Sequence, residues 1–178
     1  MSPFRPDLVD VWIFRDRTTR SPSAPESTHP VSQPAVEILL MRRSPGRILP
    51  GLWQCVSGSL ESDESVTAGA LRELSEETGF GAADILGFYD LDQVNQFHEP
   101  SVAAIVSGAV FAVRVGTLAE PILSHEHDAM QWATPEQALR LAVWPAYRES
   151  IRRIVENLLD PERAVWFGLT LDGERVRR

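Results

Sequence analysis

The run Val66–Thr78, VTAGALRELSEET, predicts a helix with a dense acidic face, and Gly79 is well placed to end it. Successive helical residues are rotated by about 100°. Three glutamates therefore share one arc of the helix surface: Glu73, Glu76 and Glu77. Val66, Ala70 and Leu74 form an adjoining apolar face that can hold the helix against a sheet. Any fold of this chain must accommodate both faces.

These carboxylates stand where an isolated helix disfavours them. Like charges one turn apart cost a few tenths of a kcal/mol each, and the C-terminal half of a helix disfavours negative charge. Such an arrangement points to a counter-ion, and oxygen-rich sites suit Mg²⁺ or Mn²⁺. Gly69, one turn earlier, is expected to leave open space beside the cluster. On the carboxylates alone, a solvated acidic face explains the pattern equally well.

Apolar runs elsewhere predict strands that precede and separate further helices. The expected strands cover residues 8–14, 35–41, 52–57, 85–91 and 102–115. Helices are expected from Thr134 and Pro145, and one more strand with a basic tail after Pro161. This order favours a mixed α/β sandwich, with one domain over residues 1–165 and a strand and tail over 166–178.

Residues 17–34 are crowded with Ser, Thr and Pro and lack apolar periodicity. We expect a long flexible loop between the first two strands. A substrate-recognition loop is one interpretation. A passive insertion is favoured, because surface loops tolerate added length at little cost.

Charge and composition exclude some functions. A formal net charge of −8 at pH 7 argues against a broad basic face for duplex nucleic acid. No apolar run reaches membrane-spanning length and residues 1–10 lack a signal-peptide core, so we expect a cytoplasmic protein without membrane contact. The single cysteine, Cys55, is expected to be a small buried residue, and its isolation agrees with a reducing compartment. A homodimer is compatible with these features.

The spacing around the glutamates is more specific than their charge. From Gly58 to Phe80 the sequence reads Gly-x5-Glu-x7-Arg-Glu-apolar-x-Glu-Glu-x-Gly-apolar. This is the Nudix box with every specified position matched, so the chain resembles the Nudix hydrolase family. The order of strands and helices fits a Nudix domain from about residue 7 to 160. The resemblance implies a Nudix-type α/β/α sandwich around a mixed β-sheet.

The resemblance also implies hydrolysis of a nucleoside diphosphate that is linked to a further group, with Mg²⁺ or Mn²⁺ as cofactor. It implies metal ligation by three side chains and one backbone carbonyl: Glu73, Glu76, Glu77 and Gly58. Arg72 matches the arginine that orients the first glutamate, and Glu64 and Gly79 match positions that support the helix and its loop. The expected catalytic group is therefore these glutamates with Arg72.

The chemistry itself follows from charge. A pyrophosphate linkage is polyanionic, so an attacking nucleophile meets repulsion at phosphorus. Cations that bridge its oxygens neutralise that charge and lower the pKa of a bound water, and a nearby carboxylate can accept the remaining proton. The reaction is phosphorus–oxygen cleavage by water, governed by positioning and electrostatics.

Downstream, Glu126 lies between His125 and His127. Many Nudix enzymes carry a further glutamate in a similar loop, so the resemblance implies that Glu126 is an additional metal ligand or the general base. A solvated loop acid is the alternative. Histidines two residues apart are weak evidence for zinc, and we expect these two and His98 at the surface.

Three arginines just upstream of the box are candidate phosphate contacts: Arg42, Arg43 and Arg47. Guanidinium groups fit phosphate oxygens bidentately, although ordinary surface arginines are equally compatible with the sequence. Trp53 and Phe97, with Asn95, are candidates for lining the pocket of the leaving organic group. Large aromatic side chains more often belong to a core.

The phrase LWQCVSGSLE, with Val56 and Ser57 where the family more often has proline and glycine, is similar to the branch that contains dihydroneopterin triphosphate pyrophosphatase. This similarity implies a nucleoside or pteridine triphosphate substrate. ADP-ribose and dinucleoside polyphosphates remain open. So do two other classes: a non-catalytic nucleotide sensor, which typically loses box glutamates, and an isoprenoid diphosphate isomerase, which needs a catalytic cysteine such as Cys55.

Overall fold

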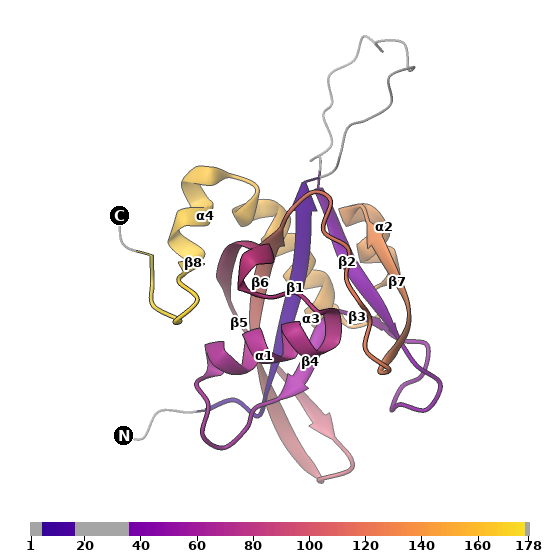
Figure 1. Ribbon diagram of the computed structural model, residues 1–178. Coiled ribbons are helices and arrows are strands. Elements are labelled where there is room, and N and C mark those ends of the chain that lie inside the picture. The colour runs from indigo at the N-terminus through magenta and orange to yellow at the C-terminus, as the bar shows by residue number, and fades with distance from the viewer. Residues whose placement is uncertain (1–4, 17–35, 177–178) are drawn as a thin grey trace, which may run out of the picture.

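The computed structural model of the protein describes residues 5–16 and 36–176 (Figure 1). The segment expected to form a flexible loop, 17–34, lies outside the described residues. The strand and tail expected over 166–178 are described up to residue 176.

The described residues form an 8-stranded mixed sheet with helices on both faces. The strands are β1 (Leu8–Asp16), β2 (Val36–Arg43), β3 (Trp53–Gln54), β4 (Val56–Ser59), β5 (Ile85–Glu99), β6 (Ala104–Val115), β7 (His127–Ala133) and β8 (Gly168–Leu169). The helices are α1 (Val66–Thr78), α2 (Pro135–Leu141), α3 (Pro145–Arg153) and α4 (Pro161–Phe167), with a 3₁₀ turn η1 (Ala82–Asp84) and a π-helical turn η2 (Ile154–Leu158). None of these described helices is long and apolar enough to cross a membrane.

β1 is the central strand of the sheet. One of its edges pairs in parallel with β6 from Leu8 to Arg15. The other edge is shared, because β4 pairs with residues 8–11 and β2 with residues 14–16, both antiparallel. β2 also pairs with β3 and β7. The chain between β3 and β4 therefore crosses from β2 to β1 at Cys55, and this crossing carries Gly58 to the middle of the sheet.

Two apolar cores lie on opposite faces of this sheet. Side chains of β1 alternate between them: Val9, Val11 and Ile13 belong to the core under α1, and Trp12 and Phe14 to the core under α2, α3 and α4. Helix α1 closes the first core with Ala70 and Leu74, both fully buried. Cys55 is buried in the second core, as expected. The α/β/α sandwich is therefore confirmed.

Helix α1 has the bounds that the sequence predicts. The Ser65 hydroxyl accepts a hydrogen bond from the N–H of Ala68 at 3.1 Å and begins the helix. Gly79 ends it with φ of 72°, a left-handed conformation that glycine adopts without strain. The Gly79 N–H donates to the carbonyl of Ser75 at 2.8 Å.

Four elements differ from expectation. Residues 52–57, expected to form one strand, belong to two, β3 and β4, which pair with different partners. β5 continues past residue 91 to Glu99, because its polar second half pairs with β6; the two strand ends project as a hairpin (Figure 1). β7 was not among the expected strands, and it pairs with β2. A strand does follow Pro161, but it is β8, with only 2 residues. The unexpected helix α4 precedes it and begins with the Asp160 carboxylate accepting from the N–H of Glu162 at 2.9 Å.

Leu74→Ala should lower the free energy of unfolding by about 2–5 kcal/mol, because it opens a cavity between α1 and the sheet where the side chain is 0% exposed. Leu118→Ala is the matched control, since Leu118 is 84% exposed. Urea denaturation followed by circular dichroism measures both variants. Equal losses in the two would contradict this placement of α1.

Candidate active site

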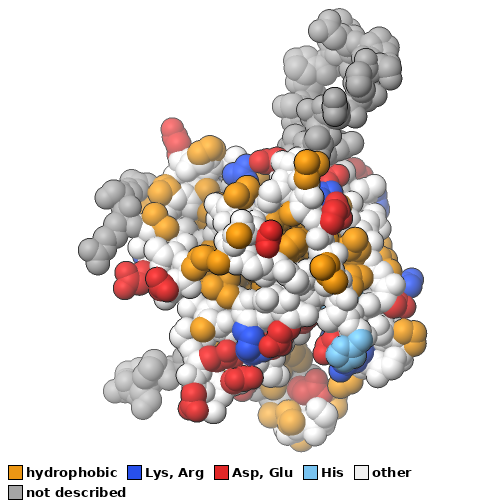
Figure 2. Space-filling model, viewed as in Figure 1, with side chains coloured by type: hydrophobic (Ala, Val, Ile, Leu, Met, Phe, Trp, Pro, Cys, Tyr) orange, Lys and Arg blue, Asp and Glu red, His pale blue; other side chains and the backbone are white. Residues whose placement is uncertain are grey.

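Acidic side chains gather around basic ones on the face of the molecule where α1 lies (Figure 2). Arg72 organises this group. Its guanidinium donates to both carboxylate oxygens of Glu64, at 2.8 and 3.1 Å. It also donates to Glu73 at 2.9 Å, to Glu76 at 3.2 Å and to the Ser59 carbonyl at 2.9 Å. One arginine therefore offsets three glutamates and ties α1 to the end of β4.

Glu64 is fixed between the helix and the loop before it. Its carboxylate accepts from the N–H of Glu61 at 2.8 Å, and hydrogen bonding to Arg72 is the main cause that lowers the pKa of Glu64 to about 2. A Cβ on Gly69 would lie 2.7 Å from a carboxylate oxygen of Glu64 and 2.3 Å from Leu60. The expectation of open space beside Gly69 is therefore wrong, since these two side chains fill it.

Gly58 and Glu73 are in direct contact. A Cβ on Gly58 would lie 1.9 Å from the carboxyl carbon of Glu73 and 2.1 Å from each of its oxygens. Only a glycine leaves room for this carboxylate against β4. Partial burial raises the pKa of Glu73, and the hydrogen bond from Arg72 opposes that shift.

Glu77 is the buried carboxylate of the cluster. One of its oxygens accepts from the N–H of Ser57 at 3.3 Å, whereas Oε2 is buried and has no hydrogen-bond partner in the described part of the chain. Burial raises the pKa of Glu77 to about 8, and the negative charges of Glu73 and Glu126 add to the shift. Glu76 on the same helix is exposed. The three glutamates therefore lie on one arc of the helix surface but differ in burial and in hydrogen bonding.

His127 is buried, so its expected surface position is wrong. It begins β7, and its Nδ1 lies 3.6 Å from Oε2 of Glu77, while its Nε2 lies 3.4 Å from the side-chain nitrogen of Gln54. Burial is the main cause that lowers the pKa of His127, which keeps the ring neutral at pH 7. His98 and His125 are exposed, as expected.

Glu126 lies in the loop before β7 and is about one-third exposed. Arg47 holds its carboxylate at 3.1 Å, and the N–H of Ser44 donates to its backbone carbonyl at 2.8 Å. Its charge raises the pKa of both Glu73 and Glu77. The fold therefore brings Glu126 to the box glutamates from a distant part of the sequence.

The upstream arginines all have partners within the protein. The contacts are Arg42 to Asp128 at 2.7 Å, Arg43 to the Ile48 carbonyl at 2.6 Å and to Gln54 at 3.3 Å, and Arg47 to His125 at 2.6 Å. Arg43 also lies close enough to lower the pKa of Glu77 and of His127. Arg43 and Arg47 thus border the carboxylates, whereas Arg42 lies near Trp53. Each guanidinium has more N–H donors than these contacts use.

The three candidates for a substrate pocket are not brought together. Trp53 packs against the core under α2 and α3, with the Arg42 guanidinium 5.9 Å from its ring centre. Asn95 is buried and donates to Asp10 at 2.7 Å. Phe97 is 43% exposed on the projecting part of β5. Strands β3 and β5 are separated in the sheet by β2, β1 and β6, so three strands lie between Trp53 and Phe97.

The donor groups of the cluster fit a hard divalent cation. They are carboxylate oxygens, and the buried Oε2 of Glu77 lacks a partner in the described structure. The backbone of Gly58 lies against the carboxylate of Glu73, so β4 is adjacent to the acidic face of the helix. Among the described residues, no three His, Cys, Asp or Glu side chains already converge as a metal site, and Arg72 contacts both Glu73 and Glu76.

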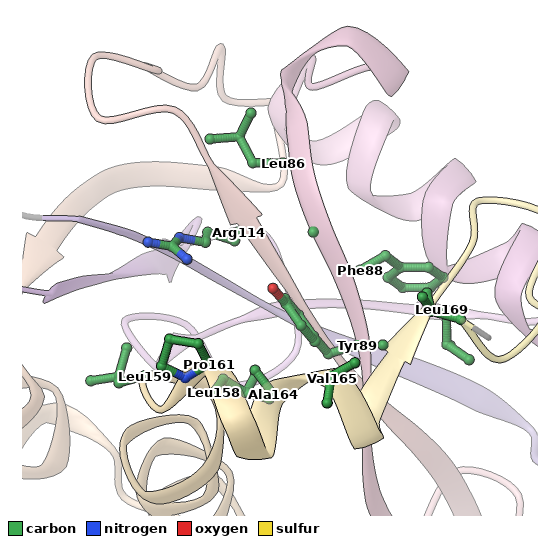
Figure 3. A pocket seen from close by; sticks show the side chains of 13 residues that line it. Leu86, Phe88, Tyr89, Arg114, Leu158, Leu159, Pro161, Ala164, Val165 and Leu169 are labelled. Carbon is green, nitrogen blue, oxygen red and sulfur yellow. The ribbon is translucent and has the colours of Figure 1, made fainter. Parts of the chain in front are cut away.

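A separate cavity of about 460 Å³ lies where β5 and β8 meet α4 (Figure 3). Most of its lining is apolar, and Arg114 and Tyr89 contribute polar groups. Arg114 is already paired with Asp16 at 2.5 Å. The residues that line this cavity include none of the box glutamates, so size alone does not locate the reactive centre.

Comparison with known proteins identifies the family. The NUDIX domain model matches residues 25–154, and the chain therefore belongs to the Nudix family. It is 33% identical over 113 residues to the CTP pyrophosphohydrolase of Escherichia coli (strain K12), covering 62% of this chain and 76% of that protein. It is 37% identical over 122 residues to the octanoyltransferase of Myxococcus xanthus, covering 67% of this chain. That match spans only 32% of the octanoyltransferase.

A solved structure supports the same fold. The dihydroneopterin triphosphate pyrophosphohydrolase of E. coli superposes with a TM-score of 0.62 and 20% identity, covering 83% of this chain and 94% of that chain. At this identity the likeness shows the Nudix fold alone. The resemblance to the Nudix hydrolases, the fold and the enzyme class are therefore confirmed.

Gly58→Ala should lower hydrolytic activity at least about tenfold while leaving the fold intact, because the new methyl group displaces the mobile end of Glu73 rather than any backbone. Gly46→Ala is the matched control, since a Cβ there meets nothing within 4 Å. Initial rates and thermal unfolding of both variants test this. Full activity in Gly58→Ala would contradict the placement of Glu73.

The ion pair of Glu64 should make stability depend on pH in one direction. The folded pKa of about 2 is below the ordinary value of 4.5, so the stabilisation is complete above pH 4.5 and is lost as pH falls towards 2. The difference in unfolding free energy between wild type and Glu64→Gln should shrink over that window. Glu136→Gln, which removes an exposed pair with Arg140, is the control. A difference that does not change with pH would refute the assignment.

Proposed function

We propose that this Nudix hydrolase is a divalent-metal-dependent pyrophosphohydrolase that acts on a nucleoside or pteridine triphosphate. The observation that carries the proposal is the buried Oε2 of Glu77, which has no hydrogen-bond partner among residues 5–16 and 36–176 and lies near a second, partly buried carboxylate, Glu73. Burying a carboxylate oxygen without a partner costs free energy. Such an oxygen is therefore expected where a bound cation or another partner interacts with it.

In this mechanism Glu73, Glu76 and Glu77 would hold Mg²⁺ or Mn²⁺ together with the Gly58 carbonyl. When bound, the cation neutralises phosphate oxygens and makes water more acidic. Arg72 keeps Glu73 and Glu76 oriented on the helix.

Glu126, which enters from another loop and keeps a partly exposed carboxylate, accepts the proton of the attacking water. Arg47 holds that carboxylate in place. Arg43, whose charge acts on Glu77, and Arg42 contact substrate phosphates with donors that their contacts within the protein do not use.

The choice of a triphosphate rests on two likenesses: the curated relative named CTP pyrophosphohydrolase and the fold of dihydroneopterin triphosphate pyrophosphohydrolase. A release assay for phosphate and pyrophosphate tests it, with dihydroneopterin triphosphate, nucleoside triphosphates, ADP-ribose and dinucleoside polyphosphates, each with and without Mg²⁺. Pyrophosphate release from a triphosphate is the expected result. Turnover of only ADP-ribose or dinucleoside polyphosphates would reject the substrate class, and tight binding without turnover of any compound would indicate a sensor.

Glu76→Gln should lower Mg²⁺-dependent kcat about 100-fold or more while leaving the unfolding midpoint unchanged, because loss of a metal ligand removes several kcal/mol of transition-state stabilisation. Glu76 is 59% exposed, so the change leaves the core intact. Glu162→Gln, on exposed α4, is the control and should keep full activity. If Glu76→Gln also keeps full activity, the assignment of metal ligation fails.

A further inference from the structure

Two buried polar atoms face each other behind the acidic cluster. Nδ1 of His127 and Oε2 of Glu77 are 3.6 Å apart, and the two side chains are 1% and 5% exposed. Neither atom has a hydrogen-bond partner among the described residues. A shift of a few tenths of an ångström would bring them into hydrogen-bond range, which satisfies both at once.

The contacts behind His127 decide which ring nitrogen carries the proton. Nε2 of the ring lies 3.4 Å from the side-chain nitrogen of Gln54. An amide nitrogen only donates, so Nε2 of His127 must accept, and the proton of the neutral ring is on Nδ1. That is the nitrogen that faces Glu77.

The Gln54 amide is itself oriented by a neighbour. Its oxygen accepts from Nη1 of Arg43 at 3.3 Å, and a guanidinium can only donate. Nε of Arg43 in turn donates to the Ile48 carbonyl at 2.6 Å. The hydrogen bonds therefore run in one direction: Arg43 donates to Gln54, and Gln54 donates to His127.

We propose that His127 is a positioning residue for Glu77, donating from Nδ1 to Oε2 in the tautomer that Gln54 and Arg43 impose. This inference rests on the proposed function, in which Glu77 is a metal ligand. Ser57 holds one carboxylate oxygen and His127 the other, and each oxygen keeps a lone pair for a cation. Hydrogen bonds of this kind orient metal ligands, and their loss lowers metal affinity or activity by roughly 10–100-fold.

The tautomer can be read in the wild-type protein without metal or substrate. Long-range ¹H–¹⁵N NMR distinguishes a proton on Nδ1 from one on Nε2, and the His127→Asn spectrum identifies the His127 signals by their absence. We expect a neutral ring protonated at Nδ1. A ring protonated at Nε2, or at both nitrogens at neutral pH, would overturn the proposal. Because the result requires no turnover, it stands apart from any failure of the proposed function.

Gln54→Glu tests how the tautomer is imposed. A carboxylate at this position presents an acceptor to Nε2, so the ring should switch to the Nε2–H tautomer and turn a lone pair towards Glu77. Gln54→Leu removes the contact without supplying an acceptor and is the matched control. An unchanged Nδ1–H signal in Gln54→Glu would contradict the role given to Gln54.

Substitutions at position 127 separate positioning from packing. Asparagine can present its amide nitrogen near the place of Nδ1, whereas leucine fills the space without a donor. Calorimetric titration of substrate-free protein with Mg²⁺ should show affinity reduced roughly 10–100-fold in His127→Leu and largely restored in His127→Asn. His98→Asn, on the projecting hairpin, controls for histidine loss. Wild-type Mg²⁺ affinity in a folded His127→Leu, or equal losses in both variants, would count against positioning.

Discussion

The guanidinium of Arg72 is the interaction on which the acidic helix depends. In the absence of a bound metal, it is the positive group that contacts both Glu73 and Glu76 and offsets the repulsion between them. The same group binds Glu64 and the Ser59 carbonyl, so it also fixes α1 relative to β4. The Arg72 guanidinium therefore both offsets negative charge in the site and attaches the helix to the sheet.

The close approach of these charged groups depends on missing side chains as much as on charges. Gly58 admits the carboxylate of Glu73, and Gly69 admits Glu64 and Leu60. The Gly58 contact depends in turn on the crossing from β3 to β4, which carries the chain from one strand of the sheet to the next. Gly58, which the box pattern specifies, and Gly69, which it does not, thus both have a packing reason in this structure.

Within the cluster, Arg72 leaves one carboxylate uncompensated. Glu73 and Glu76 contact the guanidinium, whereas Glu77 is buried with Oε2 unpartnered in the described structure and a raised pKa. A carboxylate that is expensive to keep charged, with one oxygen unpartnered among the described residues, is typical of a functional site. The approach of Glu126 from another loop places a further acid near it.

Much of this could be predicted from the sequence because it is local. The bounds of α1 follow from capping residues within a few positions, and the shared arc of Glu73, Glu76 and Glu77 follows from helical rotation alone. The burial of His127 could not be predicted in this way, since it depends on the pairing of β7 with β2, strands far apart in the sequence.

The sequence also could not predict that Leu60 fills the space beside Gly69, because this contact depends on how the loop before α1 folds back. The second half of β5 lacks an apolar pattern and becomes a strand only through its partner β6. In each of these cases, the missing information is a contact between segments rather than a property of either segment.

The central claim is that the box carboxylates form a cation site centred on Glu77. Titration of Mn²⁺ into the substrate-free protein, followed by electron paramagnetic resonance of the free ion, tests it most directly. The account predicts saturable binding in the wild type that is at least about tenfold weaker in Glu77→Gln. Equal binding in the two proteins, or no binding in the wild type, would contradict it.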